Sequence, residues 1–347
     1  MKTILLIITG LLLSANLSFA QGNAGNLIWS DEFGGTSLNG HNWEIQTGTG
    51  TSVGLTDWGN NEQQYYAAEN ISLKDGMLVI TARKEQKGNK QYTSARLRTF
   101  GKFAKTYGYF EARISLPAIQ GMWGAFWMMP ETNFYGGWAA SGEIDIMESK
   151  GRLGDRYSGA IHFGGQWPAN RYLWTGDYVF PNNSTLDDFH VYGLEWKPGV
   201  IRWYCDNKLV KEISNWDGNA TKPFDKDFHI LLNLAVGGNF DENKMPPSGF
   251  TSAEMKVDYV RVYDEKPSSN ESTQEEAGIT IFQSDEQITI HSPQAIKTAD
   301  LYSLDGKLTA RTENRNTINT SRLNKGNYVL KVEDSTQKTA VFKLLVK

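Results

Sequence analysis

The chain has 347 residues, with 35 Lys and Arg against 39 Asp and Glu, a formal net charge of −4 and no dense basic block. This balance argues against a nucleic-acid partner, which normally requires a basic surface. The single cysteine, Cys205, excludes an internal disulfide, and its place in the strand-like run IRWYCDN indicates a buried, unreactive thiol.

The first 20 residues have the features of a secretory signal peptide. Lys2 supplies a positive start, residues 4–13 are apolar, and Ser18-Phe19-Ala20 is a small-x-small cleavage signature before Gln21. An uncleaved membrane anchor is the alternative, but the apolar run is shorter than a bilayer requires. No later stretch is apolar for long enough to span a membrane. We therefore expect a secreted or cell-surface protein with no membrane span.

Residues 21–264 are predicted to form an all-β domain. Short apolar or alternating runs recur between Gly, Asn and Asp turns, a pattern typical of a sandwich or a barrel. In YFEARIS (109–115), apolar and polar side chains alternate as in a sheet with one face in water.

Tryptophan is concentrated in this domain, because all eleven lie between Trp29 and Trp216. An indole offers a flat apolar face and one N–H donor, which suits the C–H face of a sugar ring, but tryptophan is also a common core residue. We interpret Trp196 and Trp203 as core residues. The enrichment alone leaves a carbohydrate-binding surface and an ordinary core equally open.

The composition changes at Asp264. The segment DEKPSSNESTQEEAG (264–278) has five acidic residues, one Lys and no large apolar side chain, so residues 265–278 are predicted to be a solvated linker. Residues 279–347 return to short strand-like runs and are predicted to form a second, small all-β domain. This domain has no Trp and its few aromatic residues have core spacing, which argues against a carbohydrate-binding module; a structural spacer remains an alternative.

The stretch SGEIDIMES (141–149) holds three carboxylates, Glu143, Asp145 and Glu148. In a regular strand Glu143 and Asp145 share a face, whereas Glu148 would point into the core, where an ionised carboxylate is very costly. A β-bulge near Ile146 or Met147 would exchange the faces beyond it and bring Glu148 beside the other two acids. Such bulges often occur next to active sites.

Two carboxylates that flank a glycosidic bond are the machinery of glycoside hydrolysis. A separation of about 5–5.5 Å gives retention through a covalent intermediate, and about 6.5–9.5 Å leaves room for water and gives inversion. Like charges at close range raise the pKa of one member, which keeps an acid available near neutrality. Surface carboxylates or a calcium site are the alternatives, but the tryptophans in the neighbouring segments favour catalysis.

SGEIDIMES, with GMWGAFWMMP before it and WGNNEQQYY at 58–66, resembles glycoside hydrolase family 16 over residues 27–264, and most of all its laminarinase-type (endo-β-1,3-glucanase) branch. The resemblance implies a concanavalin A-like β-jelly-roll sandwich with a concave cleft. It also implies a retaining double displacement with Glu143 as the nucleophile, Glu148 as the general acid/base and Asp145 as the auxiliary carboxylate, without a cofactor. The bulged form of the family motif has two residues between the Asp and the second Glu, as here, and the unbulged form of lichenases has one.

The same resemblance implies further residues that line the cleft. Amides and an Arg would bond sugar hydroxyls, and indoles would stack beneath rings. A histidine would support the acid/base carboxylate or its sugar, unless it is simply structural. These residues are Asn60, Asn61, Arg96, Trp123, Trp127, Trp138, His162 and Trp167. The segment from Gln166 to Asn183 is expected to form a loop at the cleft rim.

A structural calcium ion on the convex face is another implication of the resemblance. The matching positions are Glu32, the backbone of Gly76, and Asp258. Hard oxygen donors suit calcium, although plain surface carboxylates explain these residues nearly as well.

The final unit resembles the C-terminal sorting domain of the type IX secretion system of Bacteroidetes. The resemblance rests on ADLYSLDGKL (299–308), INTSRLNKGNYVLKVE (318–333) and the ending KLLVK, and it implies export by that secretion machinery.

The sequence thus predicts a secreted, monomeric endo-acting hydrolase of β-1,3-glucan, with mixed-linkage β-1,3-1,4-glucan as a further substrate. The nearest alternative keeps the fold and the mechanism but acts on a β-galactan such as agar, porphyran or a mucin-type glycan. A third alternative is a lectin-like sandwich that binds the sugar without cleaving it, which would not require a bulge that delivers a second Glu.

Overall fold

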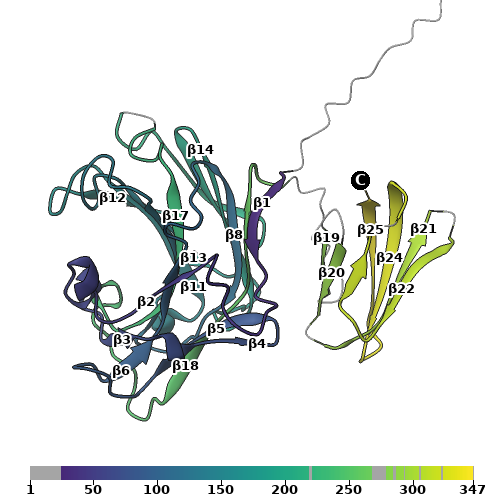
Figure 1. The fold of residues 1–347 in the computed structure, drawn as a ribbon, viewed down its shortest axis with the longest axis horizontal. Helices are drawn as coiled ribbons and strands as arrows, with labels where there is room; N and C mark the ends of the chain where they lie inside the picture. The colour runs from purple at the N-terminus through teal and green to yellow at the C-terminus, as the bar shows by residue number, and fades with distance from the viewer. Residues whose placement is uncertain are drawn as a thin grey trace, which may run out of the picture.

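The computed structural model describes residues 25–218, 221–267, 279–283, 287–292, 294–304, 306–321 and 323–346. The predicted signal peptide, and residues 268–278 of the predicted linker, lie outside the described residues. The described chain is all-β, with strands joined by turns and a few single-turn 3-10 helices (Figure 1). Within it, no helix combines the length and the apolar character needed to cross a membrane.

Two large sheets make up the first part of the chain. The ten-stranded sheet contains β1 (Leu27–Asp31), β3 (Gln64–Tyr66), β4 (Ile71–Lys74), β5 (Met77–Arg83), β6 (Tyr92–Ser94), β8 (Gly108–Ser115), β14 (His190–Lys197), β15 (Val200–Cys205), β16 (Lys208–Ser214) and β18 (Ser252–Tyr263). The eight-stranded sheet contains β2 (Glu44–Gln46), β7 (Arg96–Arg98), β9 (Met122–Pro130), β10 (Glu143–Glu148), β11 (Arg156–Phe163), β12 (Arg171–Trp174), β13 (Tyr178–Val179) and β17 (Phe228–Val236). The 3-10 helices are η1 (Thr51–Val53), η2 (Asp57–Gly59), η3 (Ala68–Asn70), η4 (Gly151–Leu153) and η5 (Asn239–Asp241).

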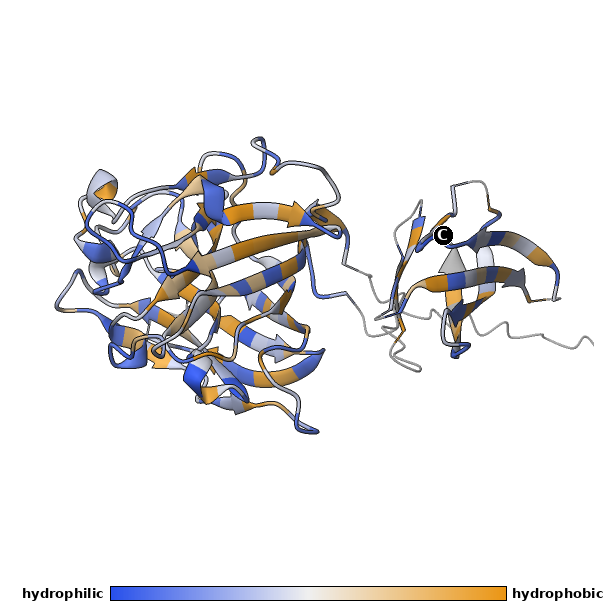
Figure 2. Ribbon diagram, turned by 90° about the horizontal axis from the view of Figure 1, so that it is seen from below, coloured by the Kyte–Doolittle hydropathy of each residue, from blue (hydrophilic) through white to orange (hydrophobic). Residues whose placement is uncertain are grey.

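The two large sheets pack face to face over one apolar core, as the predicted jelly-roll sandwich requires. Many strands alternate apolar and polar residues, which Figure 2 shows as bands of colour along the arrows. Trp196 and Trp203 are fully buried in this core, as predicted. Alternation along β8 is also confirmed for its apolar residues, but the outward-facing Glu111 is only 8% exposed. Its burial, opposed by the charge of Arg261, raises its pKa to about 7, so this face is drier than the alternation predicted.

A second, smaller group of strands follows at the C-terminal end, with an apolar core of its own. It consists of a three-stranded sheet, β19 (Thr280–Gln283), β20 (Gln287–His291) and β23 (Thr317–Asn319), and a four-stranded sheet, β21 (Ile296–Ser303), β22 (Leu308–Glu313), β24 (Gly326–Asp334) and β25 (Thr339–Val346). The predicted second all-β unit is therefore present.

Strand order places the acidic motif centrally. The eight-stranded sheet runs β12-β11-β10-β9-β17-β7-β2, so β10 lies between β11 and β9 with its outer face free of the sandwich core. We call the side of this sheet opposite the core the outer face.

Candidate active site

A β-bulge interrupts β10 at the predicted place. Against β9, Asp145 pairs with Trp127 while Met147 pairs with Phe126, and the register against β11 shifts between Asp145 and Glu148. Ile146 and Met147 are both buried, at 1% and 0% exposure, because the extra residue lets two successive side chains enter the core. Glu148 consequently shares the outer face with Glu143 and Asp145.

The carbonyl at the bulge is satisfied from the opposite sheet. The indole Nε1 of Trp203, on β15, donates to the backbone oxygen of Asp145 at 2.8 Å inside the core. The neighbouring position on β11 is Gly159, where a Cβ would lie 2.4 Å from that indole nitrogen and 2.8 Å from the Asp145 oxygen. Only glycine leaves room for this contact, so Gly159 and Trp203 together accommodate the bulge.

Each glutamate accepts a hydrogen bond from a tryptophan. Trp138 Nε1 donates to Glu143 Oε2 at 2.9 Å, and Trp123 Nε1 donates to Glu148 Oε1 at 3.0 Å. The sequence predicted these indoles as stacking surfaces, and the structure gives their N–H groups a further part in orienting the two carboxylates. Such bonds favour the ionised form of a carboxylate.

Both glutamates nevertheless hold their protons more tightly than an ordinary carboxyl group. Burial, and next the charge of Asp145, raise the pKa of Glu143 to about 7, against the opposing charge of His162. Burial, followed by the charges of Asp145 and Glu143, holds the pKa of Glu148 well above its usual range. Burial and mutual repulsion thus keep a proton available to this pair near neutrality.

His162 lies on β11 directly opposite Glu143. Its Nε2 is 3.3 Å from Asp145 Oδ2 and 3.7 Å from Glu143 Oε1, so it faces these two acids rather than Glu148, the predicted acid/base that it was expected to support. Burial opposes its charge, but the hydrogen bond and charge of Asp145, with the other two acids, raise its pKa to about 9. Glu143, Asp145 and His162 each offer one possible metal-ligand atom, and these atoms lie within 4.8 Å of one another.

Trp127 and Arg96 lie beside the acids and contact each other. Trp127 is the cross-strand neighbour of Asp145, and the Arg96 guanidinium lies between two rings, 4.7 Å from Trp127 and 4.6 Å from Trp58. Arg96 Nε also donates to Gln46 Oε1 at 2.6 Å. Arg96 was predicted to bond sugar hydroxyls, but in the structure its guanidinium stacks between two indoles and its Nε bonds Gln46.

The remaining predicted residues lie at the margins of the site. Asn60 and Asn61 are exposed after η2, and the backbone oxygen of Asn60 accepts from Asn239 N at 2.8 Å. A Cβ on Gly238 would lie 2.9 Å from the Trp123 ring and 3.2 Å from that oxygen, which places this loop against Trp123. Trp167 is 72% exposed and its ring centroid is 6.3 Å from that of Trp138.

A buried polar chain beneath Trp127 was not predicted. Trp127 Nε1 donates to Asn233 Oδ1 at 2.8 Å, Asn233 Nδ2 donates to the Tyr66 hydroxyl at 3.2 Å, and that hydroxyl donates to Glu62 Oε2 at 2.9 Å. Gln64 Nε2 also donates to Glu62 Oε2 at 2.6 Å. The alternation of polar residues at 62, 64 and 66 within NNEQQYY was the available signal, since these side chains share one face of a strand.

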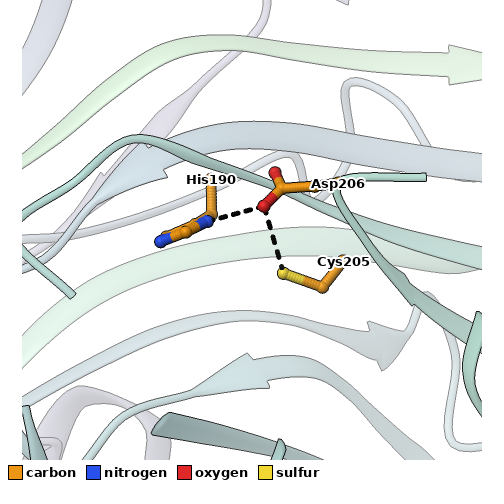
Figure 3. Close-up of side chains that lie close together, drawn as sticks. All are labelled: His190, Cys205 and Asp206. Atoms are coloured by element: carbon orange, nitrogen blue, oxygen red, sulfur yellow. Dashed lines mark hydrogen bonds and ion pairs between the residues drawn. The ribbon is translucent and has the colours of Figure 1, made fainter. Parts of the chain in front are cut away.

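A second group of ligand-type side chains is His190 on β14, Cys205 at the end of β15 and Asp206 after it, in the ten-stranded sheet (Figure 3). Asp206 Oδ2 is 2.7 Å from the His190 Nδ1 and 3.8 Å from the Cys205 Sγ, and Asp206 Oδ1 accepts from the backbone of Val191 at 2.9 Å. Burial raises the pKa of the Cys205 thiol. Each group thus has a local structural partner. The predicted burial of Cys205 is confirmed, and the raised pKa of its thiol agrees with the low reactivity that was predicted.

The residues predicted to hold calcium are engaged by cationic side chains. Arg261 donates to both oxygens of Glu32, at 2.9 and 2.7 Å, and Arg113 donates to Asp258 Oδ2 at 2.9 Å. Gly76 occupies a turn with φ +75°. Carboxylates paired with guanidinium groups do not form an oxygen cage for a divalent cation, so this arrangement does not fit calcium, and the ion stays a prediction.

Two family models match separate parts of the chain. Residues 26–265 match the family model described as "Beta-porphyranase A-D, GH16 domain". Residues 284–347 match the model described as "Secretion system C-terminal sorting domain".

Individual relatives are named as glucanases. The chain is 43% identical over 260 residues to "Glucan endo-1,3-beta-glucosidase A1" of Niallia circulans, which covers 70% of this chain and 38% of that protein. It is 39% identical to "Glucan endo-1,3-beta-glucosidase" of Cryptopygus antarcticus, covering 72% of this chain and 96% of that protein. The laminarinase catalytic domain from Thermotoga maritima matches with a TM-score of 0.64 and 36% identity, over 70% of this chain and 98% of that one. This chain thus spans well under half the length of the Niallia circulans relative.

Proposed function

The chain belongs to glycoside hydrolase family 16, and from that premise we propose that it is a secreted hydrolase that cleaves β-glucan. In finer detail, we propose an endo-acting enzyme for β-1,3-linkages, with mixed-linkage β-1,3-1,4-glucan as a further substrate. The observation that carries the proposal is the bulge that brings Glu148 onto the face of Glu143, where burial and neighbouring charges raise the pKa of both carboxyl groups.

The geometry supports a division of roles between the two glutamates. Glu148, whose pKa is held well above its usual range, is the proposed general acid that protonates the departing glycosidic oxygen. Glu143 is the proposed nucleophile, because His162 Nε2 lies 3.7 Å from its Oε1 and the charge of His162 favours the ionised carboxylate. Its carboxylate oxygen forms a bond to the anomeric carbon as the bond from that carbon to the leaving oxygen breaks.

The second step returns the enzyme to its starting state. Glu148, now a carboxylate, takes a proton from water, whose oxygen attacks the anomeric carbon and displaces Glu143. Two displacements at one carbon give net retention of configuration. Asp145 and His162 are proposed to hold Glu143 in place and to balance its charge, since the imidazole lies 3.3 Å from Asp145 Oδ2 and 3.7 Å from Glu143 Oε1.

A β-galactan is the second candidate substrate, because the matching family model carries the name of β-porphyranases. The glucan proposal is favoured by the relatives named as glucan endo-1,3-β-glucosidases, at 43% and 39% identity. Export is proposed from the sorting-domain match at residues 284–347, together with the predicted signal peptide.

The test begins with product analysis. The wild-type chain is incubated with laminarin, barley β-glucan, agarose, porphyran and a mucin glycan, and new reducing ends are measured. We expect oligosaccharides from laminarin, and products from a galactan alone would overturn the glucan assignment. Proton NMR of the first product should show the β-anomer, and an α-anomer would refute the double displacement.

Substitution separates catalysis from binding. Glu143→Gln should abolish hydrolysis while laminarin binding persists, because the amide keeps the shape of the side chain but cannot attack. Glu111→Gln is the matched control, since Glu111 is also a buried acid with a pKa raised to about 7, but lies on β8 of the other sheet. Binding without hydrolysis by the wild type would instead identify a lectin-like protein.

A further inference from the structure

The edge strand β12 (Arg171–Trp174) exposes large aromatic side chains to solvent. Tyr172 is 61% exposed and Trp174 is 49% exposed, on the terminal strand of the eight-stranded sheet. Edge strands are normally protected by charge or by short length, and clustered exposed apolar side chains usually mark a binding surface. These two residues therefore need an explanation that the fold alone does not supply.

Strand register places both rings on the outer face, in line with the catalytic acids. Tyr172 lies opposite His162, which lies opposite Glu143. Trp174 lies opposite Ala160, which lies opposite Asp145. Directly opposed residues in an antiparallel sheet point to the same side. The two rings thus continue the surface that carries the acids out to the edge of the sheet.

The aromatic surface is continuous between these points. The Tyr172 ring stacks on His162 with centroids 5.8 Å apart at 28°, and His162 lies 5.6 Å from Trp138. Trp138 in turn lies 6.3 Å from the exposed ring of Trp167. A sugar chain that leaves the cleavage point toward β12 would therefore meet ring faces along its way.

We propose that Tyr172 and Trp174, the edge platform, bind a distal stretch of the same neutral polysaccharide chain that is cleaved between Glu143 and Glu148. This inference rests on the proposed function and adds to it a binding site beyond the acids. Flat apolar rings suit the C–H faces of uncharged sugar rings. The charged neighbour on this strand, Arg171, alternates to the other face and pairs with Asp217, so its guanidinium is not part of the platform.

The test compares ligands of two lengths. In the full chain carrying Glu143→Gln, calorimetry measures the affinity for a short and a long linear β-1,3-gluco-oligosaccharide. Combining Tyr172→Ala with Trp174→Ala should weaken binding of the long ligand about tenfold and leave the short ligand within about twofold. Leu173→Ala is the matched control, because Leu173 is 40% exposed on the same strand but faces the opposite side, and it should change neither affinity.

Each other result has a defined meaning. Equal losses for short and long ligands would place the rings at the cleavage point and overturn a distal site, and so would no loss for either. An unchanged melting temperature confirms that the variants are folded. Failure of the proposed function would appear separately: the wild-type chain would not hydrolyse laminarin, and neither the short nor the long gluco-oligosaccharide would bind. A length-dependent loss with agaro-oligosaccharides alone would retain the platform and reassign the substrate.

Discussion

Replacing Trp203 with Phe tests whether the bulge in β10 depends on a hydrogen bond from the opposite sheet. The substitution keeps an aromatic ring in the core but removes the indole N–H that reaches the Asp145 carbonyl at 2.8 Å. That carbonyl lies in the core, where water cannot replace the lost donor. An orphaned buried acceptor costs about 1–3 kcal/mol, a substantial part of the stability of about 5–15 kcal/mol typical of a protein domain.

Activity should fall further than stability alone explains. If the bulge relaxes, Glu148 moves relative to Glu143, and displacement of a catalytic group by about 1 Å can cost about 100-fold in rate. We expect kcat to drop by between about 10-fold and 100-fold at a temperature where the variant is fully folded. Urea unfolding followed by tryptophan fluorescence gives the stability change, and laminarin hydrolysis gives kcat.

Trp196→Phe provides the comparison. Trp196 is also fully buried and donates its indole N–H to a backbone oxygen, that of Phe224 at 3.2 Å, but it does not contact β10 through that bond. It should lose similar stability and keep kcat within about twofold. If the two variants lose kcat equally, or if Trp203→Phe keeps full activity despite its lost stability, the indole does not hold the bulge and the reasoning is wrong.

Two further predictions concern proton equilibria. His162→Asn removes a cation that favours ionised Glu143, so the acid limb of the kcat/KM profile should move to higher pH. His229→Asn, at a buried histidine on β17 that lies 3.2 Å from Glu131, should leave the limb in place. An unmoved limb in the first variant would show that the imidazole does not stabilise Glu143, the proposed nucleophile. For Glu148, a pKa raised in the folded state means that the folded state binds more protons than the unfolded state, so stability is lost as pH rises above the unfolded pKa. Glu148→Gln removes that loss, and its gain in melting temperature over wild type should be larger at pH 8 than at pH 4; an equal gain at both would contradict the raised pKa.

The bulge could be predicted because two local rules conflicted in SGEIDIMES. Alternation assigned Glu148 to the core, and the cost of an ionised carboxylate there excluded that placement. The apolar alternation in β8 and the burial of Trp196 and Trp203 followed from equally local patterns. Short-range patterns and the cost of burying charge were thus sufficient to predict most of the fold and the arrangement of the acids.

The support around the acids could not be predicted, because its partners are far apart in the chain. Trp203 is 58 positions from Asp145, and Tyr66 is 167 positions from Asn233. No local spacing identifies such pairs, and they become visible only when the sheets are assembled. For the same reason the burial of Glu111 was missed, since Tyr263 and Arg261, on another strand, surround it.

The extra residue in β10 also limits how this strand can vary in length. Removal of one residue between Asp145 and Glu148 would leave the pattern E-x-D-x-E, in which plain alternation already directs all three acids outward. The longer strand with its irregularity and the shorter, regular one are then two backbones for a single arrangement of charges. Loss of two residues would instead turn the last carboxylate inward, so this strand tolerates shortening by a single step and no more.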